Sequence, residues 1–251
     1  MIKGTTRRFQ PTFWPTVFSI PVFLLALALG TWQLQRMEWK KEQIALRHER
    51  SAAEAVSFDE INLTSITTLA EEEFRHVWVE GEFLHDQELL LGARSLDRRL
   101  GVQVVTPFVL GNGKEILVNR GFVPSELKDA ATRPAGQVEG IVRIEGLLRI
   151  PGWKGYDFVK PANDPVKNFW FYVDIPAMAQ HAGLKNPVQD IYLDAGPAAN
   201  PGDYPLGGQT RIELVNNHLE YVITWYAMAL ILAVIYFVFH YRPVGKPEDE
   251  V

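Results

Sequence analysis

Histidine gives this sequence most of its capacity for chemistry, because the chain has six histidines and no cysteine. His218 stands out, since it comes just before an uncharged run from Tyr221 to Phe239. Tyr221 and Trp225 follow it at three and seven residues, so on a helix they share its face. An imidazole at a membrane boundary can bind a metal or transfer a proton, but aromatic residues at that depth also form an ordinary interfacial belt. The pattern alone leaves two interpretations of His218, a functional ligand and a polar boundary residue.

The other five histidines carry weaker signals. His240 ends the same apolar segment, but it lies 22 residues beyond His218, which is about 33 Å along a helix. The two side chains therefore cannot bind one metal ion. The remaining four are expected at solvated or turn positions: His48, His76, His85 and His181. His218 is the one metal ligand that we predict.

The sequence lacks the motifs of several enzyme and binding classes. It contains no GxSxG, HExxH, Walker or dinucleotide-binding motif, and without cysteine there is no thiolate zinc site, CxxC redox pair or cysteine-based copper carrier. The net charge of −5 and the absence of a long basic run argue against nucleic acid as a partner. Asn119 and Arg120 stand beside a predicted strand, where we expect them to brace a turn rather than to contact a substrate. We therefore predict a protein that is not an enzyme, with no catalytic residues and no nucleic-acid partner.

Two segments contain uncharged runs that are long enough to cross a membrane. Residues 216–241 form one, since about 20 helical residues match a hydrocarbon core of about 30 Å. Residues 9–35 form the other, and Pro15 and Pro21 are tolerated there near the start of a helix or by kinking inside a membrane. A cleavable signal peptide is the alternative for this segment, since a basic start precedes the apolar VFLLALALG. We expect it to be retained, because the apolar run is long and continues directly into a charged helix.

The charges around these segments predict the topology. Lys3, Arg7 and Arg8 precede the first segment and basic residues follow the second, so both termini are expected in the cytoplasm. Residues 36–215 would then be extracytoplasmic, beginning with a helical extension of the first segment to about Ala53. Residues 242–251 would form a cytoplasmic tail.

The region between the two membrane segments has the pattern of β-strands. Short runs rich in β-branched and aromatic residues alternate with turn residues, at 75–84, 88–93, 102–110, 114–120, 140–150, 168–175 and 190–194. The sequence GNG at 111–113 predicts a hairpin turn. A short helix is expected at 176–182, and a flexible return to the membrane at 200–208. Strands at this spacing indicate an antiparallel barrel or sandwich closed on its edges. The predicted fold class is a membrane protein in which two transmembrane α-helices flank a mainly β, barrel- or sandwich-like, extracytoplasmic domain.

Three motifs then point to a family. GTWQLQRMEWKKEQI occupies 30–44, VNRGFVP occupies 118–124 and NNHLEYVITWYAMAL occupies 216–230. Together and in this order they resemble the surfeit-locus protein one family of cytochrome c oxidase assembly factors. The resemblance implies a role in maturation of the haem-copper oxidase, by binding or delivering haem a for insertion into the catalytic subunit, and it implies His218 as the haem ligand. The expected partners are the oxidase catalytic subunit, haem a synthase and membrane lipid.

The two predicted helices bring distant residues to one membrane boundary. If both segments span, Trp32 and Arg36 lie at the same outer boundary as His218. A haem there would bind its iron at the His218 imidazole. Its apolar ring would lie among helix side chains, with Tyr221, Trp225 and Trp32 as the expected contacts.

The propionates of such a haem would lie near the surface, where Arg36 or Arg211 is expected to pair with them.

The alternative function is a membrane-anchored structural scaffold for oxidase assembly that does not bind haem. The short segment before the first helix leaves no room for a transit peptide, which favours a bacterial cell inner membrane with a periplasmic middle domain.

Overall fold

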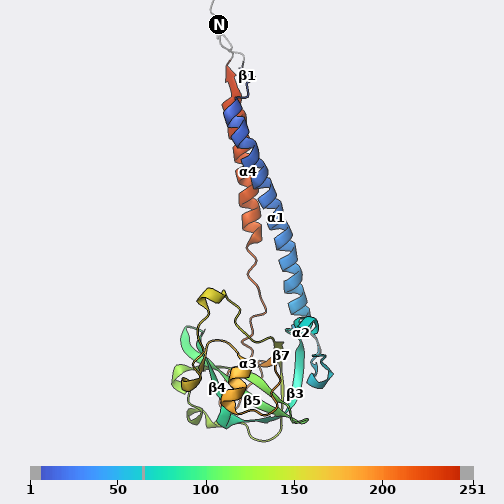
Figure 1. Ribbon diagram of the computed structural model, residues 1–251, viewed down its shortest axis with the longest axis vertical. Helices are drawn as coiled ribbons and strands as arrows, with labels where there is room; N and C mark the ends of the chain where they lie inside the picture. The colour runs from blue at the N-terminus through green and yellow to red at the C-terminus, as the bar shows by residue number, and fades with distance from the viewer. Residues whose placement is uncertain (1–6, 64–65, 244–251) are drawn as a thin grey trace, which may run out of the picture. The chain divides into compact units, whose positions relative to one another are not determined.

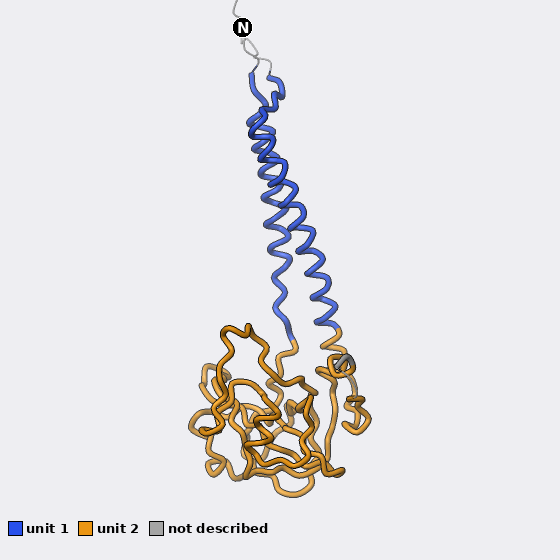
Figure 2. The backbone as a smooth tube through the Cα atoms, in the orientation of Figure 1, with its two compact units in different colours: residues 1–45, 213–251 blue, residues 46–212 orange. Residues whose placement is uncertain are grey.

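The computed structural model describes residues 7–63 and 66–243 of the chain. The chain divides into two units, residues 1–45 together with 213–251, and residues 46–212 (Figure 2). Lys3 of the basic N-terminal arm and residues 244–251 of the predicted tail lie outside the described residues.

Unit 1 is built on two long helices that run side by side in opposite directions (Figure 1). Helix α1 is Phe13–Ala52 and helix α4 is His218–His240. Both are apolar and long enough to cross a membrane. Helix α1 passes through Pro21 without ending and includes the predicted charged extension. A short antiparallel ribbon of β1 (Arg7–Phe9) and β10 (Tyr241–Pro243) links the start of α1 to the end of α4. Residues 9–12 are therefore not helical, although they were predicted to belong to the first membrane helix.

Small residues and hydroxyl groups hold the two helices together. A Cβ atom at Gly30 would lie 2.9 Å from the Tyr226 ring, so only glycine allows this approach, and Ala26 and Ala229 are buried. Hydrogen bonds cross between the helices at Thr12–His240 (2.9 Å), Thr16–Tyr236 (2.7 Å) and Thr31–Tyr226 (3.1 Å). Small residues and polar side chains of this kind drive helix association in a membrane. Apolar side chains alone do not, because the surrounding lipid tails are as apolar as they are.

Unit 2 is a small closed β-barrel with additions. Its strands are β2 (Val56–Ser57), β3 (His76–Phe83), β4 (Leu89–Leu96), β5 (Arg99–Leu110), β6 (Glu115–Pro124), β7 (Val142–Arg149), β8 (Phe169–Trp170) and β9 (Tyr192–Ala195). Neighbouring strands follow the order β3-β7-β9-β6-β5, and β5 pairs back onto β3 to close the barrel. The fold class is thus confirmed, and the barrel alternative is the correct one. The barrel is not purely antiparallel, because β6 and β9 pair in parallel.

The strands bury apolar side chains on both faces of the sheet. Ile116 and Val118 of β6 pack inside the barrel, whereas Leu117 between them packs in a second core. Helix α3 (Ile175–Ala182) covers that second core with Ile175 and Met178. The short helix α2 (Ile66–Glu72) precedes β3. Because both faces are covered, β6 is buried over nearly its whole length rather than alternating.

Two local predictions were wrong. Residues 168–175 form only the two-residue strand β8, because the Asp174 side chain accepts a hydrogen bond from the Ala177 backbone and starts helix α3 there. Residues 200–208 are not a free return, because Leu206 exchanges two 2.9 Å backbone hydrogen bonds with Phe122 of β6.

Candidate functional site

His218 is the first residue of helix α4 and is partly buried in unit 1. Its Nδ1 atom lies 2.6 Å from the Oε1 atom of Gln33 on helix α1. An amide oxygen only accepts hydrogen bonds, so Nδ1 is the atom that carries the proton. The lone pair of the imidazole is therefore on Nε2, for which the structure shows no partner among the described residues. Asn216 adds a second polar link between the helices, from its Nδ2 atom to the Met37 carbonyl oxygen at 3.4 Å.

The other residues predicted for this site lie near His218 on helix α4 and near Gln33 in the middle of helix α1. Tyr221 and Trp32 are about half exposed, at 54% and 50%, and Trp225 is partly buried. The guanidinium of Arg36 lies 4.4 Å from the ring of Trp39. Their part in binding haem stays a prediction.

Gln33 is the partner that sequence reasoning missed. It lies 185 residues from His218, so no local spacing connects them. The one available signal was its position inside the GTWQLQ motif, directly after Trp32.

A haem is the kind of ligand that this donor set fits. Over the part of the chain that the structure describes, no three His, Asp or Glu side chains gather to hold a bare metal ion. A haem iron already has four porphyrin nitrogens and needs only an axial imidazole from the protein. Metal-binding histidines also commonly donate their second ring N–H to an oxygen that fixes the ring, as His218 does to Gln33.

His240, at the opposite end of helix α4, has a different environment. It is fully buried, and its Nε2 lies 2.9 Å from Thr12 Oγ1 and its Nδ1 lies 2.8 Å from the Tyr236 carbonyl oxygen. Both ring nitrogens are engaged within the protein, which indicates a structural role.

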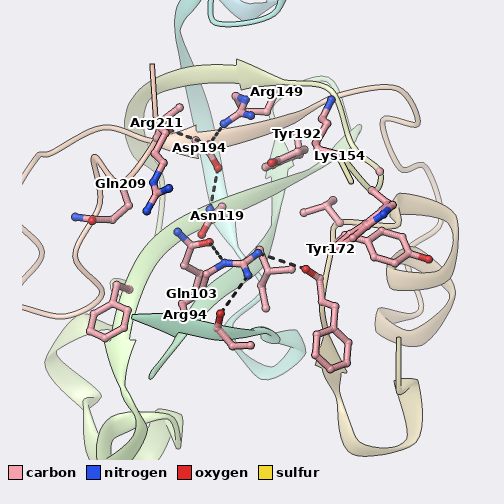
Figure 3. A pocket seen from close by; sticks show the side chains of 18 of the residues that line it. Arg94, Gln103, Asn119, Arg149, Lys154, Tyr172, Tyr192, Asp194, Gln209 and Arg211 are labelled. Carbon is pink, nitrogen blue, oxygen red and sulfur yellow. Dashed lines mark hydrogen bonds and ion pairs between the residues drawn. The ribbon is translucent and has the colours of Figure 1, made fainter. Parts of the chain in front are cut away.

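Unit 2 contains a cavity of about 720 Å³ that the sequence did not predict. Its walls come from strands β4, β5, β6, β7 and β9 and from the segments 150–154, 171–173 and 208–211. Figure 3 shows that charged and amide side chains from these separate segments converge on it, among them Arg94, Asn119, Arg149 and Asp194.

A bulge in strand β6 places Asn119 in this cavity. Val105 pairs with Asn119 and Val104 pairs with Gly121, so Arg120 between them is an extra residue. Gly121 has φ = +114°, and a Cβ atom there would lie 1.8 Å from the Leu206 carbonyl oxygen. Only glycine fits this position.

Asp194 is the centre of the hydrogen-bond network in the cavity. Its carboxylate accepts from Asn119 Nδ2 (2.8 Å), Arg149 Nη1 (2.9 Å) and Thr210 Oγ1 (2.8 Å). Burial alone would lower the pKa of Arg149, but the charges of Asp194, Tyr192 and Glu73 and the hydrogen bond to Asp194 together outweigh it and raise that pKa. Arg149 therefore belongs to a satisfied ion pair.

Arg94 is a cation without such a pair. It donates to Gln103 Oε1 at 3.3 Å and to the carbonyl oxygens of Gly92 and Phe171, at 3.1 and 3.4 Å, all of them neutral. Burial lowers the pKa of Arg94, and the electrostatic effects of Tyr192 and Asp194 offset this only in part.

Arg120, on the other side of the bulge, is structural, as predicted. It donates to the Gly136 carbonyl oxygen and lies 3.5 Å from Glu88. The same Glu88 carboxylate also accepts from Arg133. This buried ion cluster holds the segment 133–137 against the barrel, and it does not line the cavity.

The fold and the site define a class: a membrane protein in which two long apolar helices flank a closed β-barrel along the chain, with a histidine at the start of the second helix hydrogen-bonded to the first. The model of the SURF1 family matches residues 20–230 of the chain. The chain is 39% identical to a SURF1-like protein of Monosiga brevicollis over 92% of its own length and 88% of the relative's. It is also 37% identical to Surfeit locus protein 1 of Homo sapiens, over 87% of the chain and 74% of that protein.

The chain belongs to the SURF1 family. This family is generally known for assembly of cytochrome c oxidase rather than for an enzymatic reaction. The matched range includes both Gln33 and His218.

Proposed function

We propose that this protein assists the assembly of a haem-copper cytochrome c oxidase by binding haem a at His218 and passing it to the catalytic subunit. Membership of the SURF1 family supports the process. The Gln33–His218 hydrogen bond carries the assignment of the site, since it leaves the Nε2 lone pair of a neutral imidazole free for an axial bond to iron.

The side chains around His218 suit a transiently held haem. Tyr221 follows His218 on helix α4, Trp32 is next to Gln33 on helix α1, and both expose apolar rings. Such rings cover a flat macrocycle without forming a closed pocket. Arg36 is exposed and can meet a propionate at the aqueous boundary. A ligand that must later be released to a partner is better served by one axial histidine on an open surface than by a buried cleft.

Gln33 acts as a positioning residue in this proposal. By accepting a hydrogen bond from Nδ1–H, with Nδ1 and Oε1 2.6 Å apart, it selects the tautomer whose Nε2 atom binds metal, and it restricts rotation of the ring. The partners that follow from the proposal are haem a synthase as the source of haem and the oxidase catalytic subunit as its acceptor.

The proposal places the protein in a bacterial cell inner membrane, with the β-barrel unit on the periplasmic side. Arg7 and Arg8 before helix α1 and Arg242 after helix α4 support this orientation, since positive charge is retained on the cytoplasmic side. The His218 end of the helix pair is then the periplasmic end.

Absorbance of the purified protein tests the site. We would co-express wild type, His218→Ala, Gln33→Leu and His240→Ala with haem a biosynthetic enzymes, purify each in mild detergent and compare Soret absorbance per protein. His218→Ala should lose haem, and Gln33→Leu should retain it about 10- to 100-fold less tightly, the usual effect of removing the partner of a metal-binding histidine. His240→Ala is the matched control, because it also removes an interhelical histidine hydrogen bond.

The outcomes separate this function from the alternative. Equal haem in wild type and His218→Ala would refute the ligand assignment. If no variant binds haem but oxidase assembly still depends on the protein, the scaffold function is favoured. The hydrogen bonds that His218 and Asn216 make to helix α1 would then have a structural role only.

A further inference from the structure

Positive charge is in excess around the cavity of unit 2. Arg94, Arg149, Lys154 and Arg211 line it, and Asp194 is the one carboxylate among the described lining residues. The lining thus carries an excess of three positive charges, in a chain whose net charge is −5. Such an excess at a concave surface attracts and concentrates anions.

The acidic groups nearby are already occupied. Asp194 accepts three side-chain hydrogen bonds within the protein, including one from Arg149. Glu73 lies outside the lining and is shared between Arg149 and Lys154, at 3.6 and 3.7 Å. These two carboxylates therefore balance Arg149 and Lys154 and leave the other two cations uncompensated.

Arg94 and Arg211 are the uncompensated cations. Within residues 7–63 and 66–243 no carboxylate oxygen lies within 4.0 Å of either guanidinium. Arg94 is fixed by neutral oxygens and contributes its charge to the cavity. Arg211 is exposed, and the structure shows no hydrogen bond from its guanidinium to another described residue. Arg94 is partly buried without a counter-ion, which costs free energy that an anion in the cavity would offset. Arg211 is exposed, and its N–H donors are free to bind such an anion directly.

The size and the lining of the cavity indicate that the anionic group belongs to a larger, partly apolar molecule. A volume of about 720 Å³ is typical of sites for small organic molecules, roughly 300–1,000 Å³, and exceeds what an inorganic ion fills. Trp153 and Tyr172 line the cavity with ring centroids 6.2 Å apart, and they offer apolar surface beside the cations. Tyr172 is labelled in Figure 3.

We propose that this cavity binds the oxyanion group, carboxylate or phosphate, of a small organic molecule. Arg211 is its direct hydrogen-bond donor, Arg94 supplies a fixed positive charge, and Trp153 and Tyr172 contact the apolar remainder. Planar guanidinium groups bind either oxyanion through paired N–H donors. The proposal does not rest on haem binding at His218, which belongs to the other unit.

Calorimetric titration of the full-length protein in mild detergent tests this site. Succinate, inorganic phosphate and dihexanoyl phosphatidic acid are the probes, so the arms distinguish a carboxylate, a free phosphate and a lipid phosphate. Dihexanoyl phosphatidylcholine controls for partition into detergent. We expect saturable binding of at least one probe, weaker at higher salt, and a loss of about tenfold or more in affinity for Arg211→Gln.

A matched variant separates the site from general charge effects. Arg143→Gln also removes one exposed arginine from unit 2, but Arg143 lies outside the cavity lining. Lys154→Gln is a second cavity variant, and thermal unfolding checks that every variant folds. The proposal is wrong if no probe binds, or if Arg211→Gln and Lys154→Gln both bind the probe as tightly as Arg143→Gln does.

Discussion

Replacing Glu88 with alanine is expected to destabilise unit 2 strongly. The Glu88 side chain is only 8% exposed and lies between two arginines that are almost completely buried, Arg120 and Arg133, at 2% and 3%. Its carboxylate also accepts from Gln137 Nε2 at 3.3 Å. The change would leave two buried guanidinium groups with no negative partner in this cluster.

The structure gives a magnitude for this loss. Removing one partner of a buried ion pair costs about 3–5 kcal/mol, because the remaining charge stays desolvated. Burial already lowers the pKa of Arg120 to about 10, against the opposing effect of Glu88, so the loss of Glu88 should lower that pKa further. For a unit that spans residues 46–212, each kcal/mol corresponds to about 2–4 °C, so Tm should fall by roughly 6–20 °C.

Thermal unfolding of the full-length protein in detergent, followed by near-ultraviolet circular dichroism, measures the effect. Glu82→Ala is the control, since Glu82 is an exposed glutamate on strand β3 and its loss should cost less than about 0.5 kcal/mol. Glu88→Gln should lie between the two, because it keeps the volume and one acceptor oxygen but loses the charge. A fall in Tm of less than about 2 °C for Glu88→Ala would show that the cluster contributes little to stability and that this reasoning is wrong.

Two further predictions concern unit 1 and its orientation. Cysteines in place of Arg8 and Arg242, which are paired directly across the antiparallel ribbon of β1 and β10, should cross-link on oxidation. Adding Gly30→Leu should reduce the yield by overpacking the helix interface, at a cost of about 1–3 kcal/mol, and an unchanged yield would contradict close packing at that glycine. Single cysteines at Ser125 and at Glu248 should react with an impermeant thiol reagent from the outside at Ser125 only, and labelling at Glu248 in intact cells would reverse the proposed topology.

The features that the sequence predicted well depend on local properties. A run without charge over about 20 residues needs a membrane or a core wherever it lies, so both long helices were visible. The GNG turn was visible as well, because the conformations it needs are those that glycine allows, and strands β5 and β6 do pair across it.

The features that it missed depend on pairs that are distant along the chain. Closure of the barrel joins β3 to β5, and the parallel pairing of β6 with β9 joins Val118 to Leu193. The strand predicted at 168–175 failed because Asp174 and the proline after it favour a helix start over a continued strand. The alternation of apolar residues along the sequence predicts neither the pairing of distant strands nor the start of this helix.

The two polar sites were hidden for the same reason. Arg94, Arg149 and Asp194 come from three different strands, and only the finished barrel brings them to one cavity. Gln33 reaches His218 only when the two helices pair. The sequence could identify His218 by its position at the end of an apolar run, but the atom that fixes its tautomer required the structure.

The VNRGFVP motif shows how one local distortion serves both sides of the barrel wall. Successive residues of a strand point to opposite faces, and here Asn119 turns to Asp194 in the cavity while Arg120 turns to Glu88. The bulge that sets this arrangement requires the left-handed conformation of Gly121 and the close approach of Leu206. The motif therefore packs the barrel wall and thereby fixes the positions of Asn119 and Asp194 in the cavity. Its effect on any ligand of the cavity would be exerted through Asn119 and Asp194, and not through Arg120.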